Sequence, residues 1–164
     1  EEAHQYDSFP GINAAYRQRI YDLYVYKLNA TYAYLSRDAK RMAGGMQVNL
    51  IYNFLNAMAT SQPGVPKFVH LSAHDDNIFW LLVALNAFDG KKVAYAAHVV
   101  FELRQDDGNG ALTVNAVYNG VPLLFPFCQG QLACPYSLFS SYVQDFLVPD
   151  LASRAELCGI PSPP

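Results

Sequence analysis

Two segments of alternating apolar and polar residues constrain the fold of this chain more than any other feature. Residues 97–103 place Val99, Phe101 and Leu103 on one side, and residues 112–118 alternate in the same way. This is the two-residue period of a β-strand. The residues between them, 106–110, are the Asp, Gly and Asn residues typical of a tight turn. The sequence therefore predicts a β-hairpin with one face turned toward a core.

Helices are expected on both sides of this hairpin. Between Ala14 and Leu35 the apolar residues recur at i, i+3, i+4 and i+7, which predicts a long helix with one buried stripe. Gly44-Gly45 then punctuates the pattern, which resumes from Leu50 to Met58, before the Pro/Gly turn of residues 62–66. Further helices are predicted over residues 78–85 and 136–147. The predicted fold class is α/β, with helices that flank a sheet.

Composition excludes several function classes. The chain has 164 residues, 15% charged and 14% aromatic, with a net charge of −3, which fits one domain with part of its surface covered by another polypeptide. No stretch gathers more than two adjacent Lys or Arg, so nucleic acid is excluded as a partner. The longest apolar runs are about ten residues, short of the roughly 20 that span a membrane. Glu1–His4 lacks the basic start of a signal peptide, so we expect a cytosolic chain or the trimmed end of a mature one.

One segment combines a histidine with a carboxylate at a predicted strand-to-helix junction. Lys67–Ser72 is a short apolar run that predicts a strand, and His74 and Asp75 follow it after one residue, Ala73. Ligands collect at the carboxyl ends of strands, and helix starts favour anions such as phosphate. His74 could donate a hydrogen bond to a phosphoryl oxygen, and a protonated Asp75 could protonate a leaving alcohol. The alternative is that Asp75 or Asp76 only caps the helix.

Metal binding is not expected. His70 and His74 have the four-residue spacing of a helical metal pair, but they lie in a predicted strand and turn without a third ligand. His98 lies in an alternating strand and is interpreted as structural. We also expect no cofactor.

The cysteines indicate an oxidising compartment. Cys128 and Cys134 lie in a Pro/Gly/Gln-rich loop that can close a small disulfide, worth about 2 kcal/mol. Cys158 is left over, which suggests an intermolecular bond or a free thiol. Asn29-Ala30-Thr31 is a glycosylation sequon on a predicted helix, so Asn29 is a candidate glycosylation site.

The segment Ser72-Ala73-His74-Asp75, followed by Asn77-Ile78, resembles the C-terminal His-Asp motif of the histidine acid phosphatases. Further segments on both sides of this motif also resemble the family and occur in the family's order. Together the matches run from about His4 to Cys158. They are Arg41–Gly45, Tyr95–Leu103, Val117–Leu123 and the Cys128/Cys134 loop.

The resemblance implies an enzyme that hydrolyses phosphate monoesters through a phosphohistidine intermediate. It implies that this chain is the C-terminal half of one phosphatase domain, with residues 1–62 in the helical lobe and residues 63–160 in the α/β core. His74 would contact the phosphate, and Asp75 would be the general acid. The family's nucleophilic histidine lies in an Arg-His-Gly motif. No arginine of this chain is directly followed by a histidine, so the motif is absent from these residues. An N-terminal fragment bearing that motif is therefore an expected partner.

The resemblance also bears on the disulfide of Cys158, the location of the enzyme and its oligomeric state. Cys158 resembles a family cysteine that bonds to the N-terminal half, so its partner would lie outside this chain. The expected location is secreted, lysosomal or cell-surface, and a homodimer is possible because related enzymes are often dimers. Asp76 and Asn77 replace the family's Thr-Thr, and Ala97 replaces a frequent cysteine. The alternative function is a noncatalytic binding or structural protein that retains the fold.

Overall fold

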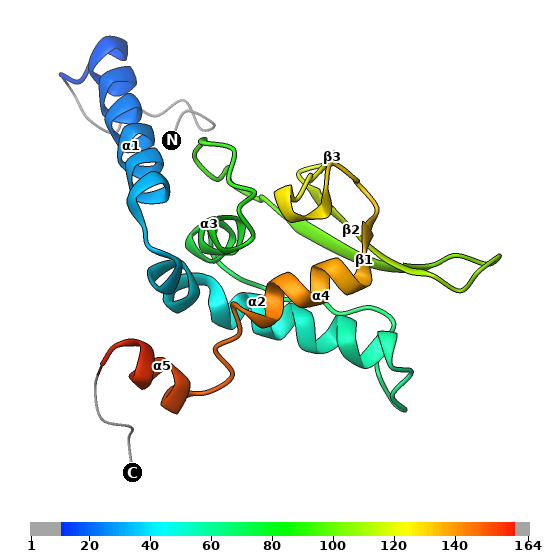
Figure 1. The fold of residues 1–164 in the computed structure, drawn as a ribbon. Coiled ribbons are helices and arrows are strands. Elements are labelled where there is room, and N and C mark those ends of the chain that lie inside the picture. The colour runs from blue at the N-terminus through cyan, green and yellow to red at the C-terminus, as the bar shows by residue number, and fades with distance from the viewer. Residues whose placement is uncertain (1–10, 160–164) are drawn as a thin grey trace. The chain divides into compact units, whose positions relative to one another are not determined.

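The computed structural model describes residues 11–159 and divides the chain into two compact units (Figure 1). Residues 11–34 and 90–92 belong to the first unit, and residues 35–89 and 93–159 belong to the second. In chain order the elements are α1 (Ala14–Tyr34), α2 (Arg37–Ala59), α3 (Asp75–Ala84), β1 (Val99–Gln105), β2 (Leu112–Tyr118), β3 (Val121–Pro122), η2 (Pro126–Cys128), β4 (Cys134–Pro135), α4 (Tyr136–Gln144) and α5 (Leu151–Leu157).

The first unit consists of α1 and the short segment Gly90–Lys92. The helix is confirmed, but the predicted buried stripe is wrong, because Leu28 alone among the residues of α1 is buried. Ile20 and Leu23 are 58% and 61% exposed. Within the described part of this unit, α1 has only a three-residue segment to pack against. The Asn29 amide donates a hydrogen bond of 2.9 Å to the Gly90 carbonyl oxygen.

The second unit begins with α2, which differs from the prediction at its glycines. The expected interruption at Gly44-Gly45 is wrong, because the helix continues through both residues. The break lies eight residues before Gly44, where the Ser36 hydroxyl accepts the backbone N–H of Ala39 at the start of α2. A side chain on Gly44 would collide with the Trp80 carbonyl oxygen in α3. The glycines therefore allow close helix packing rather than end the helix.

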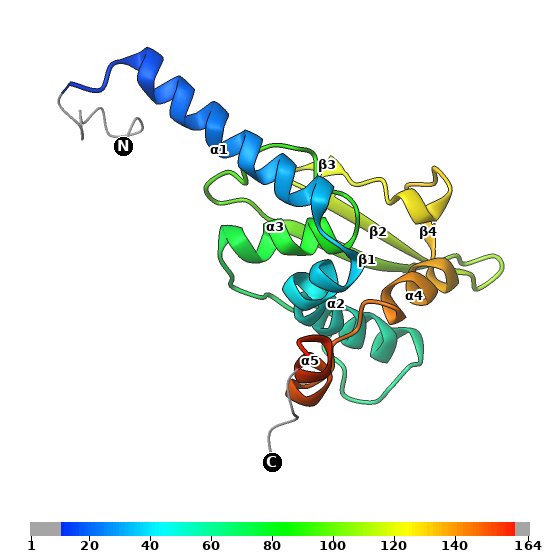
Figure 2. The same cartoon turned by 60° about the vertical axis from the view of Figure 1, so that its left-hand side comes forward.

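The sheet is small and antiparallel. The predicted hairpin is confirmed: β1 and β2 pair over their whole length, from Val99 opposite Tyr118 to Gln105 opposite Leu112. In the turn, the Asp106 carboxylate accepts the backbone N–H groups of Gly108 and Asn109. β3 and β4 both pair with β2, so β2 is central and β1 forms an edge, as Figure 2 shows.

The core lies where helices pack against one face of the hairpin. Phe101 and Leu103 of β1 share this face with Val114 and Ala116 of β2, as the alternation predicts. α2, α3 and α4 supply the other side of the core. The buried core residues of these helices, with Leu85 directly after α3, are Val48, Tyr52, Leu55, Leu81, Ala84, Leu85, Phe139 and Val143.

The connection between α2 and α3 is a further difference from the prediction. Lys67–Ser72 forms no strand; Figure 1 draws it as an irregular line. A strand needs neighbours for its backbone groups, and no strand of the described chain pairs with this segment. α4 ends at Gln144, three residues before the predicted end, and α5 was not predicted.

Candidate functional site

The His74–Asp75 pair lies at the start of α3, where the backbone is held on both sides. His74 is the N-cap residue, with an extended backbone, and its carbonyl oxygen accepts the N–H groups of Asn77 and Ile78 at 3.1 and 3.3 Å. The Asn77 side-chain oxygen accepts the backbone N–H of His74 at 3.0 Å. The cap residue and the first turn of α3 are therefore joined by reciprocal hydrogen bonds.

Asp75 and Asp76 occupy the first turn of α3 rather than the cap position. One carboxylate oxygen of Asp75 accepts the backbone N–H of Asp76 at 3.1 Å. Negative charges in the first turn are stabilised by the positive end of the helix dipole. The interpretation that Asp75 or Asp76 caps the helix is wrong, because His74 has that place.

This turn combines an open surface with a rigid support. His74, Asp75 and Asp76 are all exposed. The rest of α3 is anchored, since the residues from Leu81 to Ala84 are buried within the second unit. The His-Asp pair is therefore open to solvent at the start of an ordered helix.

The other histidines do not join this pair into a metal site. In residues 11–159, no three His, Cys, Asp or Glu side chains are grouped so that they could hold a metal ion. The His98 backbone N–H donates to the Asn119 side chain at 3.0 Å, and its carbonyl oxygen accepts the Asn119 N–H. These bonds of the His98 backbone close the open end of the hairpin, and the structural role of its imidazole stays a prediction.

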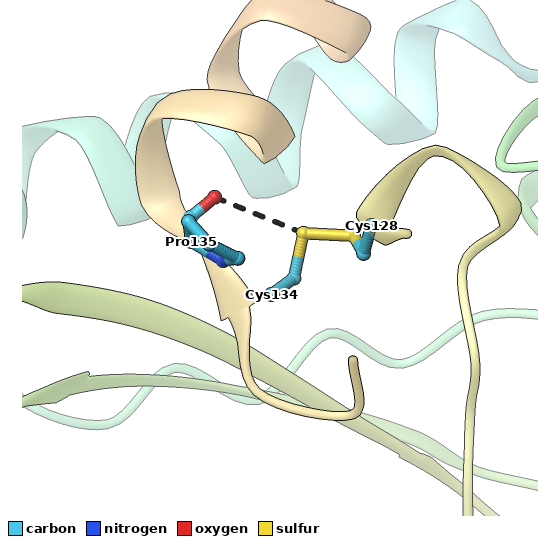
Figure 3. The surroundings of a disulfide bond; sticks show 3 residues. All are labelled: Cys128, Cys134 and Pro135. Atoms are coloured by element: carbon cyan, nitrogen blue, oxygen red, sulfur yellow. Dashed lines mark hydrogen bonds between the residues drawn. A yellow bond between two sulfur atoms is a disulfide. The ribbon is translucent and has the colours of Figure 1, made fainter. Parts of the chain in front are cut away.

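The three cysteines form one disulfide and one free thiol, as their spacing predicts. Cys128 and Cys134 form a fully buried disulfide that joins η2 to β4 (Figure 3). The Cys134 sulfur also lies 3.7 Å from the Pro135 carbonyl oxygen. Cys158 is exposed and free, and its thiol lies 3.0 Å from the Met42 sulfur.

No family model matches the chain, but several curated proteins do. Lysosomal acid phosphatase of Rattus norvegicus is 32% identical over 123 residues, 71% of this chain and 28% of that protein. The Xenopus laevis protein of the same name is 32% identical, over 67% of this chain and 26% of its own length. Prostatic acid phosphatase of Homo sapiens is 28% identical, over 72% of this chain and 31% of its own length.

The chain belongs to the histidine acid phosphatase-like family. It spans under a third of the length of these relatives. Its mixed α/β structure, a small antiparallel sheet flanked by helices, is compatible with part of a phosphatase fold. The disulfide fits the oxidising compartment that a lysosomal or secreted relative occupies. Within residues 11–159, no helix combines the length and the apolarity needed to cross a membrane.

The sequence analysis assigned no structural role to one residue of this turn. Asn77 is the side chain that fixes the backbone before the His-Asp pair. The signal was present, because a polar side chain three residues after the N-cap is the second half of a capping box. In the sequence, Asn77 is recognised only as part of the His-Asp segment and as a departure from the family's Thr-Thr.

Proposed function

We propose that this chain is the C-terminal part of an acid phosphatase that hydrolyses phosphate monoesters. The observation that carries the proposal is the exposed His74–Asp75 pair, held at the start of a buried helix in a chain related to acid phosphatases. His74 donates a hydrogen bond to a phosphoryl oxygen. Asp75, as the general acid, protonates the leaving alcohol.

The reaction has two steps in this proposal. A nucleophilic histidine outside these residues attacks phosphorus; a P–N bond forms, the P–O bond to the alcohol breaks, and the Asp75 proton passes to the departing oxygen. Water then attacks phosphorus, the P–N bond breaks, and the water proton returns to Asp75. The backbone N–H groups at the start of α3 stabilise the negative charge of the phosphate. No cofactor is required.

The nucleophile comes from the remainder of the protein. None of the six arginines of this chain is directly followed by a histidine. The relatives are more than three times as long as the aligned part. An N-terminal segment bearing the Arg-His-Gly motif, in the same polypeptide or a separate one, completes the site. Residues 1–62 then belong to the helical lobe and residues 63–160 to the α/β core.

The proposal also covers the location of the enzyme, the disulfide of Cys158, the glycan on Asn29 and the oligomeric state. Its location is secreted, lysosomal or cell-surface, supported by the disulfide and the names of the relatives. Cys158 forms a disulfide with the N-terminal segment, supported by its exposed thiol. Asn29 is exposed and carries a glycan on Nδ2, which replaces one of the two hydrogens that this amide donates to the carbonyl oxygens of Val25 and Gly90. The completed enzyme forms a homodimer.

The test uses the complete protein that contains these residues. Asp75→Asn removes the acid, and Asp76→Asn changes the neighbouring exposed carboxylate as a matched control. With an alkyl phosphate at pH near 5, we expect Asp75→Asn to lower kcat roughly 100-fold or more. With p-nitrophenyl phosphate the loss is smaller, because that leaving group needs less protonation. Asp76→Asn retains both activities.

Two results would overturn this function. Equal losses on both substrates in Asp75→Asn would remove the acid role from that residue. A complete wild-type protein without activity on either substrate, and without binding of vanadate, would support the noncatalytic binding or structural alternative.

Mass spectrometry tests the expected partner. The intact mass of the natural protein is measured with and without a reductant, and any released chain is sequenced. We expect a peptide with the Arg-His-Gly motif linked to Cys158. A free Cys158 thiol in the oxidised protein would contradict this pairing.

A further inference from the structure

The sequence contains two Asn-Gly pairs, and each lies in a turn of the sheet. Asn109-Gly110 belongs to the turn between β1 and β2, and Asn119-Gly120 joins β2 to β3. Asparagine is among the thermolabile residues. It is least stable before glycine, because no side chain then shields the following backbone nitrogen from the carboxamide. All four residues are exposed, so only their hydrogen bonds distinguish the two pairs.

The carboxamide of Asn109 is held beside its own following peptide. Its oxygen Oδ1 accepts the backbone N–H of Ala111 at 2.8 Å, which is an Asx turn. The ring that this bond closes includes the Gly110 nitrogen, so that nitrogen and Cγ of Asn109 lie on the same small loop. The bond also draws electron density away from Cγ. Both effects favour attack of the Gly110 nitrogen on Cγ.

One hydrogen bond opposes this attack. The Gly110 N–H donates to the Asp106 carbonyl oxygen at 2.9 Å. This bond joins residues of one exposed turn at the end of the hairpin, which projects from the second unit (Figure 1). Local opening of such a turn costs far less free energy than unfolding of the whole protein. The Gly110 nitrogen is therefore released in a fraction of the molecules while the rest of the sheet stays folded.

The carboxamide of Asn119 is held by a distant part of the chain instead. Its oxygen accepts the backbone N–H of His98 at 3.0 Å, and the Asn119 N–H donates to the His98 carbonyl oxygen at 3.1 Å. To turn toward Gly120, this carboxamide has to separate from the chain that leads into β1. Such an opening disturbs the paired end of the hairpin and costs more free energy than the opening of its tip. Asn119 is therefore protected.

We propose that Asn109 is a site of spontaneous modification, at which the amide becomes aspartate or isoaspartate. In the first step the Gly110 nitrogen bonds to Cγ of Asn109, the Cγ–Nδ2 bond breaks, and the Gly110 proton leaves with Nδ2 as ammonia. Water then opens the cyclic imide: its oxygen stays on the carbonyl carbon that is cleaved, and one of its protons returns to the nitrogen. Cleavage of the bond to Cγ gives aspartate, whereas cleavage of the bond to the backbone carbonyl carbon gives isoaspartate.

Both products change the tip of the hairpin. Each adds a negative charge beside Asp106 and Asp107, in a chain with a net charge of −3. In isoaspartate the main chain also runs through Cβ and Cγ, which lengthens the turn and displaces Gly110 from the Asp106 carbonyl oxygen. The neighbouring bond, from the Asp106 N–H to the Ala111 carbonyl oxygen at 2.9 Å, should then weaken. Neither step involves the His-Asp pair, so the inference does not depend on the proposed phosphatase function.

Isotope labelling of the complete natural protein tests the site. The protein is incubated at neutral pH in water enriched in the heavy oxygen isotope and is then digested in ordinary water, so that only conversion before digestion introduces heavy oxygen. Mass spectrometry compares the peptides that contain Asn109 and Asn119. We expect Asn109 to convert at least about tenfold faster than Asn119 in the folded protein, and the two rates to become similar in urea. No conversion of Asn109, equal rates in the folded protein, or an equally large difference in urea would overturn the proposal.

A matched pair of variants identifies the modified residue by its charge. Asn109→Gln keeps a carboxamide, but its longer side chain would form a larger and less favoured ring with Gly110. Asn119→Gln makes the same change in the other pair. After incubation, isoelectric focusing should show an acidic form of the wild-type protein and of Asn119→Gln, and this form should be absent from Asn109→Gln. An equal amount of the acidic form in Asn109→Gln would overturn the proposal.

Discussion

The side-chain oxygen of Asn77 accepts the backbone N–H of His74, and the backbone N–H of Asn77 donates to the His74 carbonyl oxygen. This reciprocal pair fixes the backbone of the residue that precedes Asp75. The helix start and the proposed chemistry consequently depend on the same side chain.

Replacement of Asn77 tests this dependence. Asn77→Ala removes one of the two hydrogen bonds and should lower the free energy of unfolding by about 1 kcal/mol, as measured by urea unfolding. In the complete enzyme, kcat should fall more than KM changes, because Asp75 loses its fixed position. Asn77→Asp keeps an acceptor oxygen and should restore both quantities. An unchanged kcat in Asn77→Ala would show that this hydrogen bond does not position the acid.

A methyl group at Gly44 or Gly45 should destabilise the protein. At Gly45 the added carbon would lie 2.6 Å from the Phe146 carbonyl oxygen, and at Gly44 it would meet the backbone of Trp80. Overpacking of this kind costs about 1–3 kcal/mol, more than the helix propensity that alanine adds. Thermal and urea unfolding measure the loss. Asn53→Ala, at an exposed position of α2, is the control and should change stability by less than about 0.5 kcal/mol.

Stability should fall at high pH because of Tyr136. Burial, together with the neighbouring Tyr52, raises the pKa of Tyr136 to about 12. An unfolded tyrosine titrates near 10, so between pH 10 and 12 the folded protein holds the proton that the unfolded chain releases. The free energy of unfolding therefore decreases as pH rises through this window. In Tyr136→Phe the free energy of unfolding should decrease less steeply with pH. An equally steep decrease in that variant would show that other groups cause it.

Loss of the disulfide should also be measurable. Replacement of both Cys128 and Cys134 by alanine removes the cross-link and should lower the free energy of unfolding by about 2 kcal/mol through chain entropy. Because both sulfurs are buried, lost packing adds to this value. Cys158→Ala in the isolated chain serves as the control for an exposed thiol. A double variant as stable as the control would show that the loop is fixed by packing alone.

The sequence predicted the hairpin well because the information is local. The alternation of residues 112–118 gave the bounds of β2, and the Asp/Gly/Asn turn matched the observed hydrogen bonds of Asp106. The cysteine spacing likewise led to the observed disulfide. The position of His74 and Asp75 at a helix start followed from the apolar period of α3.

The errors concern features that depend on distant parts of the chain. Gly44-Gly45 looks like a helix break in isolation, and only the approach of α3 and of Phe146 shows why glycine is needed there. Lys67–Ser72 has the composition of a strand, but a strand forms only where a neighbour accepts its hydrogen bonds. The apolar side of α1 has a helical period, yet burial also requires a surface to cover it.

The open edge of β1 has a practical consequence for the expression of this chain. A seven-residue strand with Val, Phe and Leu, whose outer edge pairs with no strand of residues 11–159, is a template for strands of other molecules. Residues 1–164 produced alone should therefore aggregate as the protein concentration rises, and co-expression with the remaining polypeptide should keep them in solution. In the cell, the same edge makes a detached chain of this kind a substrate for chaperones.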